Sequence, residues 1–154
     1  MITERYDDIT YRVIGAAMRV HNALGPGFKE SAYQKALGIE LENERLSFQA
    51  EHPVDIVIDG ASIGLLYLDH LVEEKVVVEE KAVSHPLTND EVAQVITYLC
   101  ATGNSVGLLL NFGRQRLEYK RIFPPQKTDL WRTRIHRYVW NPVGSVSVNS
   151  LPIR

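Results

Sequence analysis

The sequence predicts an α/β (α+β) fold in which a mixed five-stranded sheet is flanked by helices. Three observations predict it. Two helical patterns open the chain, three strand-like runs joined by short turns follow, and a capped helix leads into two further strands. The 154 residues suit one domain with a real core, which we expect at residues 1–123, followed by a C-terminal extension at residues 124–154.

The N-terminal part of the chain predicts two helices. Apolar residues recur at helical spacing from Thr3 to Leu24, and Thr3 is a candidate N-cap. The run Gly25-Pro26-Gly27 breaks this first helix. A second helical pattern extends from about Glu30 to Arg45.

From Ser47 the pattern of apolar residues changes from helical spacing to alternation. The segment 52–58 predicts a strand, and the segments 63–72 and 76–82 predict two further strands. Asp59-Gly60 predicts a hairpin turn, either tight or lengthened by Ala61 and Ser62. Because hairpins join them, these three strands should run antiparallel.

The last third predicts a helix and two strands. Thr88-x-x-Glu91 is typical of a capping box, and Gly103 of the C-terminal cap of the same helix. The apolar segment 105–112 suits a strand covered on both faces, and the segment 116–123 is a last alternating strand. The intervening helix allows a parallel crossover between the third and fourth strands.

Composition bounds the function loosely. The net charge of −2 provides no global basic field, which counts modestly against tight nonspecific DNA binding. No apolar run approaches the ~20 residues of a membrane span, and the polar N-terminus is unlike a signal peptide, so we expect a cytoplasmic protein. The single Cys100 excludes an internal disulfide, and we expect it to be buried on a helix.

The stretch from Asp69 to Lys81 carries the candidate chemistry. Because strand side chains alternate, Glu79 and Lys81 point one way and Glu80 the other. Charge at the end of an apolar strand is costly unless it has a task, and we infer the task of holding a divalent metal and a water against a phosphodiester. An acid-x-lysine pattern also occurs at residues 73–75 and 118–120, but only the copy at Glu79 has Asp69 upstream and an apolar strand leading into it.

Counting residues predicts how the two acids pair. Opposed residues of antiparallel strands have a constant sum of numbers, so Asp69 and Glu79 share a face only if that sum is even, with 148 the simplest case. That register leaves residues 73–75 as a three-residue loop and predicts either positive φ near Lys75 or a bulge between the acids. A regular two-residue turn would instead bring Glu80 beside Asp69.

Two helices carry further candidates. Glu30 lies in the first turn of the second helix, where the helix dipole alone also favours a carboxylate. Gln94 and Tyr98 are four residues apart and therefore neighbours on the helix at residues 88–102. They form either a solvent-facing surface or a donor surface, with the Gln94 amide donating to phosphate or water and the Tyr98 ring holding a base or sugar.

These residues carry a resemblance to a known family. Asp69, the pair Glu79 and Lys81, and Gln94-x-x-x-Tyr98 resemble the successive motifs of the PD-(D/E)xK nuclease superfamily, the last one in the form used by its RecB-like branch. The segment Gly27–Tyr33 (GFKESAY) is similar to the signature of the bacterial GxxExxY family, and the LLNFG and KRI segments at residues 109–113 and 120–122 fit its closing strands. Two departures are Leu68, where the superfamily name has proline, and the tail beyond Pro124.

The resemblance implies a restriction-endonuclease-like core and a nuclease that depends on Mg²⁺ or Mn²⁺, with DNA the favoured substrate. Asp69 and Glu79 would ligate the metal by their side chains, and the main-chain carbonyl of Glu80 would supply a third oxygen. Lys81 would position or help deprotonate the attacking water. Glu30 would be an outer or additional metal ligand. Gln94 and Tyr98 would orient the substrate.

A second function stays open, namely a nuclease-like nucleic-acid-binding or assembly module that cleaves nothing. The complete acid–acid–lysine set favours the enzyme. The acidic net charge favours the module, or an enzyme that works as a homodimer or with a partner protein. The tail interleaves basic and aromatic residues between Lys127 and Trp140, which suits either a nucleic-acid arm or a packed, dimer-forming extension.

Overall fold

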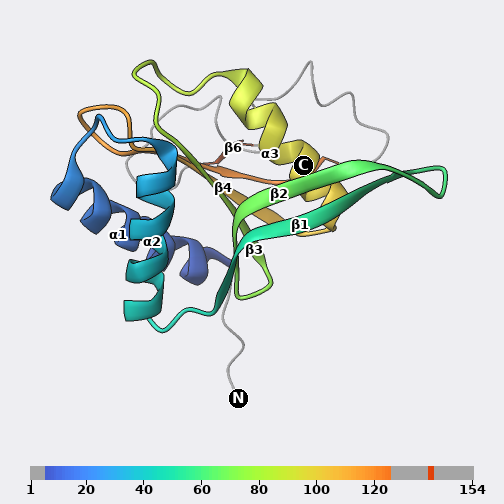
Figure 1. Ribbon diagram of the computed structural model, residues 1–154, viewed down its shortest axis with the longest axis horizontal. Coiled ribbons are helices and arrows are strands. Elements are labelled where there is room, and N and C mark those ends of the chain that lie inside the picture. The colour runs from blue at the N-terminus through green and yellow to red at the C-terminus, as the bar shows by residue number, and fades with distance from the viewer. Residues whose placement is uncertain (1–5, 126–138, 141–154) are drawn as a thin grey trace.

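The protein forms a mixed sheet with helices on both faces, as the sequence predicts (Figure 1). The structure is a computed structural model and describes residues 6–125 and 139–140. The helices are α1 (Tyr6–Leu24), α2 (Glu30–Asn43) and α3 (Asn89–Thr102). The strands are β1 (Phe48–Ile58), β2 (Ala61–Val72), β3 (Val76–Lys81), β4 (Val106–Asn111), β5 (Glu118–Ile122) and β6 (Val139–Trp140).

The described strands lie in the sheet in the order in which they occur along the chain, β1 to β6. Neighbouring strands are antiparallel except β3 and β4, which are parallel and are connected through α3. The five predicted strands and the parallel crossover are therefore confirmed. β6 adds a short edge strand from the extension, whereas the candidate cap Thr3 and most of the tail lie outside the described residues.

Two apolar layers sandwich the sheet, and strand alternation decides which side chain enters which layer. Val76 and Val78 of β3 pack with α1 and α2, while Val77 packs with α3 on the other face. On β4 the close approach of α3 requires Gly107, because a Cβ there would lie 2.5 Å from Cγ1 of Val95. Within the described residues, no helix is long and apolar enough to span a membrane.

Local signals of the sequence account for most element ends. Thr88 and Glu91 form the predicted capping box, and Gly103 caps α3 with a φ of 76°. β1 begins at Phe48 rather than at residue 52, because Phe48 pairs with Val72 and packs on the layer of α1 and α2. The prediction for Cys100 was wrong, since this side chain lies on the exposed face of α3.

The turn between β2 and β3 confirms the predicted register. Val72 pairs with Val76, so opposed residue numbers sum to 148 and residues 73–75 form the loop. Positive φ occurs in this loop, but at Glu73 (53°) and Glu74 (56°) and not at Lys75. The N–H of Lys75 donates to the carbonyl of Val72 at 2.9 Å, which closes a tight turn with two left-handed central residues.

The β1–β2 ribbon bends and then extends away from the rest of the sheet (Figure 1). Regular pairing is interrupted between Ala50↔His70 and His52↔Leu68, and Glu51 has a φ of 53° at this point. Beyond the bend, Val54 and Leu68 pack on the α3 side. The bend leaves Asp69 where β2 departs from β3.

Candidate functional site

Asp69 and Glu79 are joined by hydrogen bonds between side chain and main chain. The N–H of Asp69 donates to Glu79 Oε1 at 3.0 Å, and the N–H of Glu80 donates to Asp69 Oδ2 at 2.8 Å. Backbone pairing of β2 with β3 ends one residue earlier, at His70↔Val78. Where the two strands separate, hydrogen bonds from one oxygen of each carboxylate therefore replace the backbone–backbone hydrogen bonds of the sheet.

Glu79 faces α3, together with the predicted polar pair on that helix. The pKa of Tyr98 is raised to about 12 by burial and then by the negative charges of Glu79 and Asp69, while a hydrogen bond with Gln94 acts in the opposite direction. The Tyr98 hydroxyl thus lies in the field of both acids. The Tyr98 side chain is only 7% exposed, so its ring cannot hold a base, as the sequence had suggested it could.

The surroundings of Glu79 destabilise its ionised carboxylate. Burial raises its pKa to about 9, and the neighbouring carboxylates of Asp69 and Glu80 act in the same direction. The N–H of Asp69 and the charge of Lys81 oppose the shift without cancelling it. Burial is therefore the main cause of the shift, and crowding by the other carboxylates adds to it. A cation bound between Asp69 and Glu79 would relieve this strain.

Glu80 points to the opposite face, where His70 and α2 surround it. Its two carboxyl oxygens lie 3.1 and 3.2 Å from Nδ1 of His70, and both side chains are only 1% exposed. Burial raises the pKa of Glu80, with Asp69 and Glu30 adding to the effect, and burial lowers the pKa of His70 to about 4. Glu30 therefore contributes negative potential at Glu80, on the α2 side of the cluster.

His70 and Gln34 lie next to Asp69 on the α2 side, although the motifs of the sequence predict no role there for either. The Gln34 side chain donates to the Asp69 carbonyl at 3.3 Å, and the Gln34 main chain is hydrogen-bonded to His70. The signal was present, because a sum of 148 places His70 diagonal to Glu80 on one face of the sheet. The sequence does not predict the pairing of His70 with Glu80, because the burial of the two side chains depends on the packing of distant segments.

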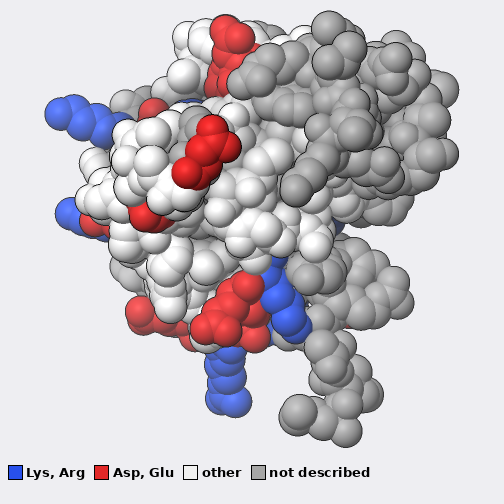
Figure 2. Space-filling view, turned by 90° about the vertical axis from the view of Figure 1, so that its right-hand side faces the viewer, with Lys and Arg blue, Asp and Glu red and all other residues white. Residues whose placement is uncertain are grey.

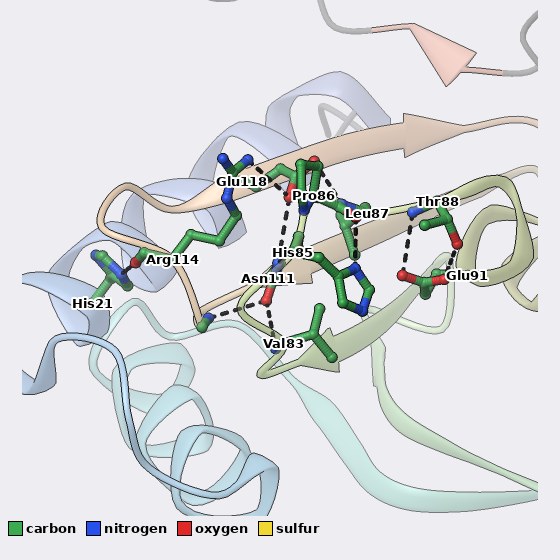
Figure 3. A network of polar contacts seen from close by, with 11 residues as sticks. His21, Val83, His85, Pro86, Leu87, Thr88, Glu91, Asn111, Arg114 and Glu118 are labelled. Atoms are coloured by element: carbon green, nitrogen blue, oxygen red, sulfur yellow. Dashed lines mark hydrogen bonds and ion pairs between the residues drawn. The ribbon is translucent and has the colours of Figure 1, made fainter.

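A polar network holds the loop that connects Lys81 to α3 (Figure 3). Asn111 Oδ1 accepts from the N–H groups of Val83 and Gly113 at 3.0 Å each, and its Nδ2 donates to the His85 carbonyl at 3.3 Å. Glu118 accepts from the Leu87 N–H at 3.0 Å, just before the capping box of α3. The network therefore links the strand that carries Lys81 to the helix that carries Gln94 and Tyr98.

The other two acid-x-lysine copies have structural partners. Glu73 accepts from the N–H and hydroxyl of Ser47 at 2.6 and 2.7 Å, which lowers its pKa. Glu118 accepts from Leu87 and from the Asn111 amide. These bonds explain both acids without a metal, so the copy at Glu79 stands apart as the sequence argued.

The donor set around Asp69 suits a hard divalent cation. Asp69 and Glu79 each have a carboxylate oxygen beyond the one that accepts from the main chain, and the Asp69 carboxylate also lies within hydrogen-bonding reach of the Glu80 carboxyl. Oxygen ligands are those that Mg²⁺ and Mn²⁺ prefer. Within the described residues, no three His, Cys, Asp or Glu side chains group into a cation site by themselves. A site here would therefore need oxygens from the main chain, water or substrate besides the two carboxylates.

Comparison with known proteins identifies the family. A profile of the PD-(D/E)XK nuclease superfamily matches residues 7–122. The chain belongs to this superfamily. Its fold is accordingly the restriction-endonuclease-like α/β fold that the motifs implied, and the nuclease family implies a nucleic-acid substrate.

No curated protein matches the sequence of this superfamily member. Among solved structures, it is similar to an alkaline exonuclease (LHK-Exo) from Laribacter hongkongensis, at 13% sequence identity and a TM-score of 0.41. That similarity covers 80% of this chain and 73% of the exonuclease chain.

Proposed function

We propose that the protein is a metal-dependent nuclease that hydrolyses phosphodiester bonds of nucleic acid, with DNA the favoured substrate. One observation carries the proposal. Asp69 and Glu79 face one another at the point where β2 and β3 separate, with Lys81 next on the same face of β3, in a buried setting that raises the pKa of Glu79 to about 9. A structural acid pair would gain nothing from such repulsion.

We further propose that the chain belongs to the GxxExxY branch. The local structure of the motif supports this assignment, because each of its three named residues has a distinct place. Gly27 has a φ of 116°, Glu30 opens α2, and the Tyr33 hydroxyl donates to the Gly25 carbonyl and accepts from the Phe28 N–H. The Tyr33 ring also stacks on Phe112 at 4.7 Å, so the motif fixes the entry of α2 toward the acids.

In this proposal Asp69 and Glu79 hold the cation with their side chains, and the Glu80 carbonyl supplies a further oxygen. Nucleases of this superfamily generally use divalent metal ions, and Mg²⁺ or Mn²⁺ suits the oxygen donors. When bound, the ion would supply charge neutralisation at the phosphate and a more acidic water. Glu30 would act from α2 as an outer ligand, because within the described residues no third acidic side chain groups with the two carboxylates.

The remaining side chains would act on the water and the substrate. Lys81 follows Glu79 by two residues on one face, so its ammonium can orient the attacking water and offset charge on the phosphorane. Gln94 lies on α3 within hydrogen-bonding reach of Tyr98, and its amide can donate to a phosphate oxygen. With its ring buried, Tyr98 would act through its hydroxyl.

Cleavage of labelled single-stranded and duplex DNA and RNA, in linear and circular form, with Mg²⁺ or Mn²⁺, tests the proposal. We expect cleavage by the wild type and a loss of about 10²–10³-fold in kcat/KM for Lys81→Ala, the loss typical of removing one transition-state donor. Lys120→Ala is the matched control, since Lys120 ends the acid-x-lysine copy on β5. Equal rates for the two variants would remove Lys81 from the proposed site. Binding without cleavage by the wild type would point to the non-catalytic module.

A further inference from the structure

An open hollow lies beside Asp69, on the side toward the β1–β2 ribbon. It is lined by five residues from α2, β1 and β2: Gln34, Glu51, Tyr67, Leu68 and Asp69. It lies where regular pairing of β1 with β2 is interrupted, since Glu51, with a φ of 53°, and Asp69 stand between the pairs Ala50↔His70 and His52↔Leu68. The hollow therefore opens directly next to one of the two acids of the proposed active site.

Tyr67 presents its ring at this hollow. Its side chain is 59% exposed, whereas Tyr98 across the site is 7% exposed. Tyr67 pairs with the exposed Pro53 of β1, so a flat apolar neighbour adjoins the ring. Tyr67 does not join the core, and it ends a row of exposed apolar side chains on β2, with Ile63 and Leu65, as the member nearest to Asp69.

The charges around the hollow favour a base over a phosphate as its occupant. Glu51 carries a carboxylate, which repels phosphate, while an aromatic face binds any base by stacking. Figure 2, which views the molecule from the side of the β1–β2 turn, shows Asp and Glu as well as Lys and Arg scattered over a described face that is otherwise uncharged. No broad basic surface is visible there to attract a duplex backbone.

We propose that Tyr67 is a base-stacking subsite that holds an unpaired nucleotide beside the scissile phosphate, so that the enzyme prefers single strands or frayed ends. This inference rests on the proposed nuclease function. Two residues along a strand span about 6.6 Å, and stacked bases of one strand lie about 3.4 Å apart, so a base on Tyr67 lies one or two nucleotides from a phosphate at Asp69. A base stacked there must first leave its duplex.

Binding without cleavage tests the subsite separately from catalysis. Fluorescence anisotropy in EDTA measures the affinity for a single-stranded oligonucleotide and for the blunt duplex of the same sequence, and 2-aminopurine in the strand reports stacking. Tyr67→Leu keeps an apolar side chain on β2 but removes the aromatic face. Tyr67→Phe keeps that face, and Tyr11→Ala controls for loss of an exposed tyrosine elsewhere, since Tyr11 of α1 is 67% exposed.

We expect Tyr67→Leu to weaken single-strand binding about tenfold and to restore 2-aminopurine fluorescence, because stacking on one aromatic contributes that much. Tyr67→Phe should stay within about twofold of the wild type, as should Tyr11→Ala and duplex binding by every variant. Equal single-strand affinity of Tyr67→Leu and wild type would overturn the subsite, as would absence of single-strand binding by the wild type. A cleavage assay with Mg²⁺ distinguishes failure of the subsite from failure of the nuclease proposal. Binding that depends on Tyr67, without any cleavage, would contradict only the nuclease proposal. Cleavage that depends on Lys81 but is unchanged in Tyr67→Leu would contradict only the subsite.

Discussion

The main-chain N–H of Asp69 donates to Glu79 Oε1 at 3.0 Å, one residue beyond the last backbone pair of β2 and β3. Each acid is thus anchored by the strand of the other, and the anchoring depends on the register of the hairpin. A shift by one residue would put Glu80 in place of Glu79 and turn Lys81 to the other face. The properties of the site therefore depend on the strand pairing as much as on the acids.

The raised pKa of Glu79 makes stability depend on pH. A carboxyl whose pKa is higher in the folded state holds its proton more firmly there, so stability is lost as pH rises from the unfolded value of 4.5 toward about 9. His70, with a folded pKa of about 4, acts oppositely, but only below its unfolded value of 6.5. Between pH 6.5 and 8.5 in EDTA, we expect the wild type to lose about 1 kcal/mol per pH unit more than Glu79→Gln.

Urea unfolding at pH 6.5, 7.5 and 8.5 measures this difference in the free energy of unfolding. Glu42→Gln, which removes an exposed carboxylate from α2, is the control and should keep the wild-type dependence on pH. Parallel pH profiles for wild type and Glu79→Gln would show that Glu79 is not held in an unfavourable charge environment.

Divalent cations should stabilise the folded protein through Asp69. A ligand that binds only the folded state at 100 times its Kd adds about 2.7 kcal/mol, which corresponds to a rise in Tm of roughly 5–10 °C for a chain of this size. Differential scanning fluorimetry with Mg²⁺ or Mn²⁺ against EDTA should show this rise in the wild type and in Glu42→Gln. In Asp69→Asn the rise should vanish, and a rise as large as that of the wild type would mean that the ion binds elsewhere.

The turn between β2 and β3 allows a test in which two neighbouring substitutions have opposite signs. Glu74 has a φ of 56°, a conformation that costs a non-glycine residue about 1–2 kcal/mol, whereas Lys75 lies outside the positive-φ residues of the described chain. We expect Glu74→Gly to raise the free energy of unfolding by about 0.5–1 kcal/mol and Lys75→Gly to lower it by a similar amount. Chemical denaturation measures both, and destabilisation by Glu74→Gly would place the left-handed residue elsewhere.

Asn111 should be important for stability, because it pairs with Lys81 on the neighbouring strand and its side chain holds the loop that follows Lys81. Its side chain satisfies the N–H groups of Val83 and Gly113, which Asn111→Ala would leave without that acceptor. We expect the free energy of unfolding to fall by about 2–3 kcal/mol. Asn22→Ala on the exposed surface of α1 is the matched control and should cause no such loss. A loss below about 0.5 kcal/mol for Asn111→Ala would show that the loop after Lys81 is held by other contacts.

Counting along the chain was enough to choose the acids. The apolar run into Glu79, the spacing back to Asp69 and the even sum of 148 are all properties of the sequence, because alternation along a strand is set by local backbone geometry. The capping box at Thr88 and the turn at Asp59-Gly60 could also be predicted from the sequence, because both depend on local backbone geometry. Both turn residues have positive φ.

Tertiary structure alone decided what surrounds those acids. Packing buries the ring of Tyr98, which therefore cannot act as a stacking platform. It also places Gln34 against the Asp69 main chain and His70 against Glu80. Glu73 and Glu118 obtain hydrogen-bond partners that explain them structurally. The β1–β2 ribbon left Tyr67 exposed, beside Glu51 and Asp69. Burial and bending arise from contacts between segments far apart in sequence, and a pattern within one strand or helix carries no record of which segment will cover it.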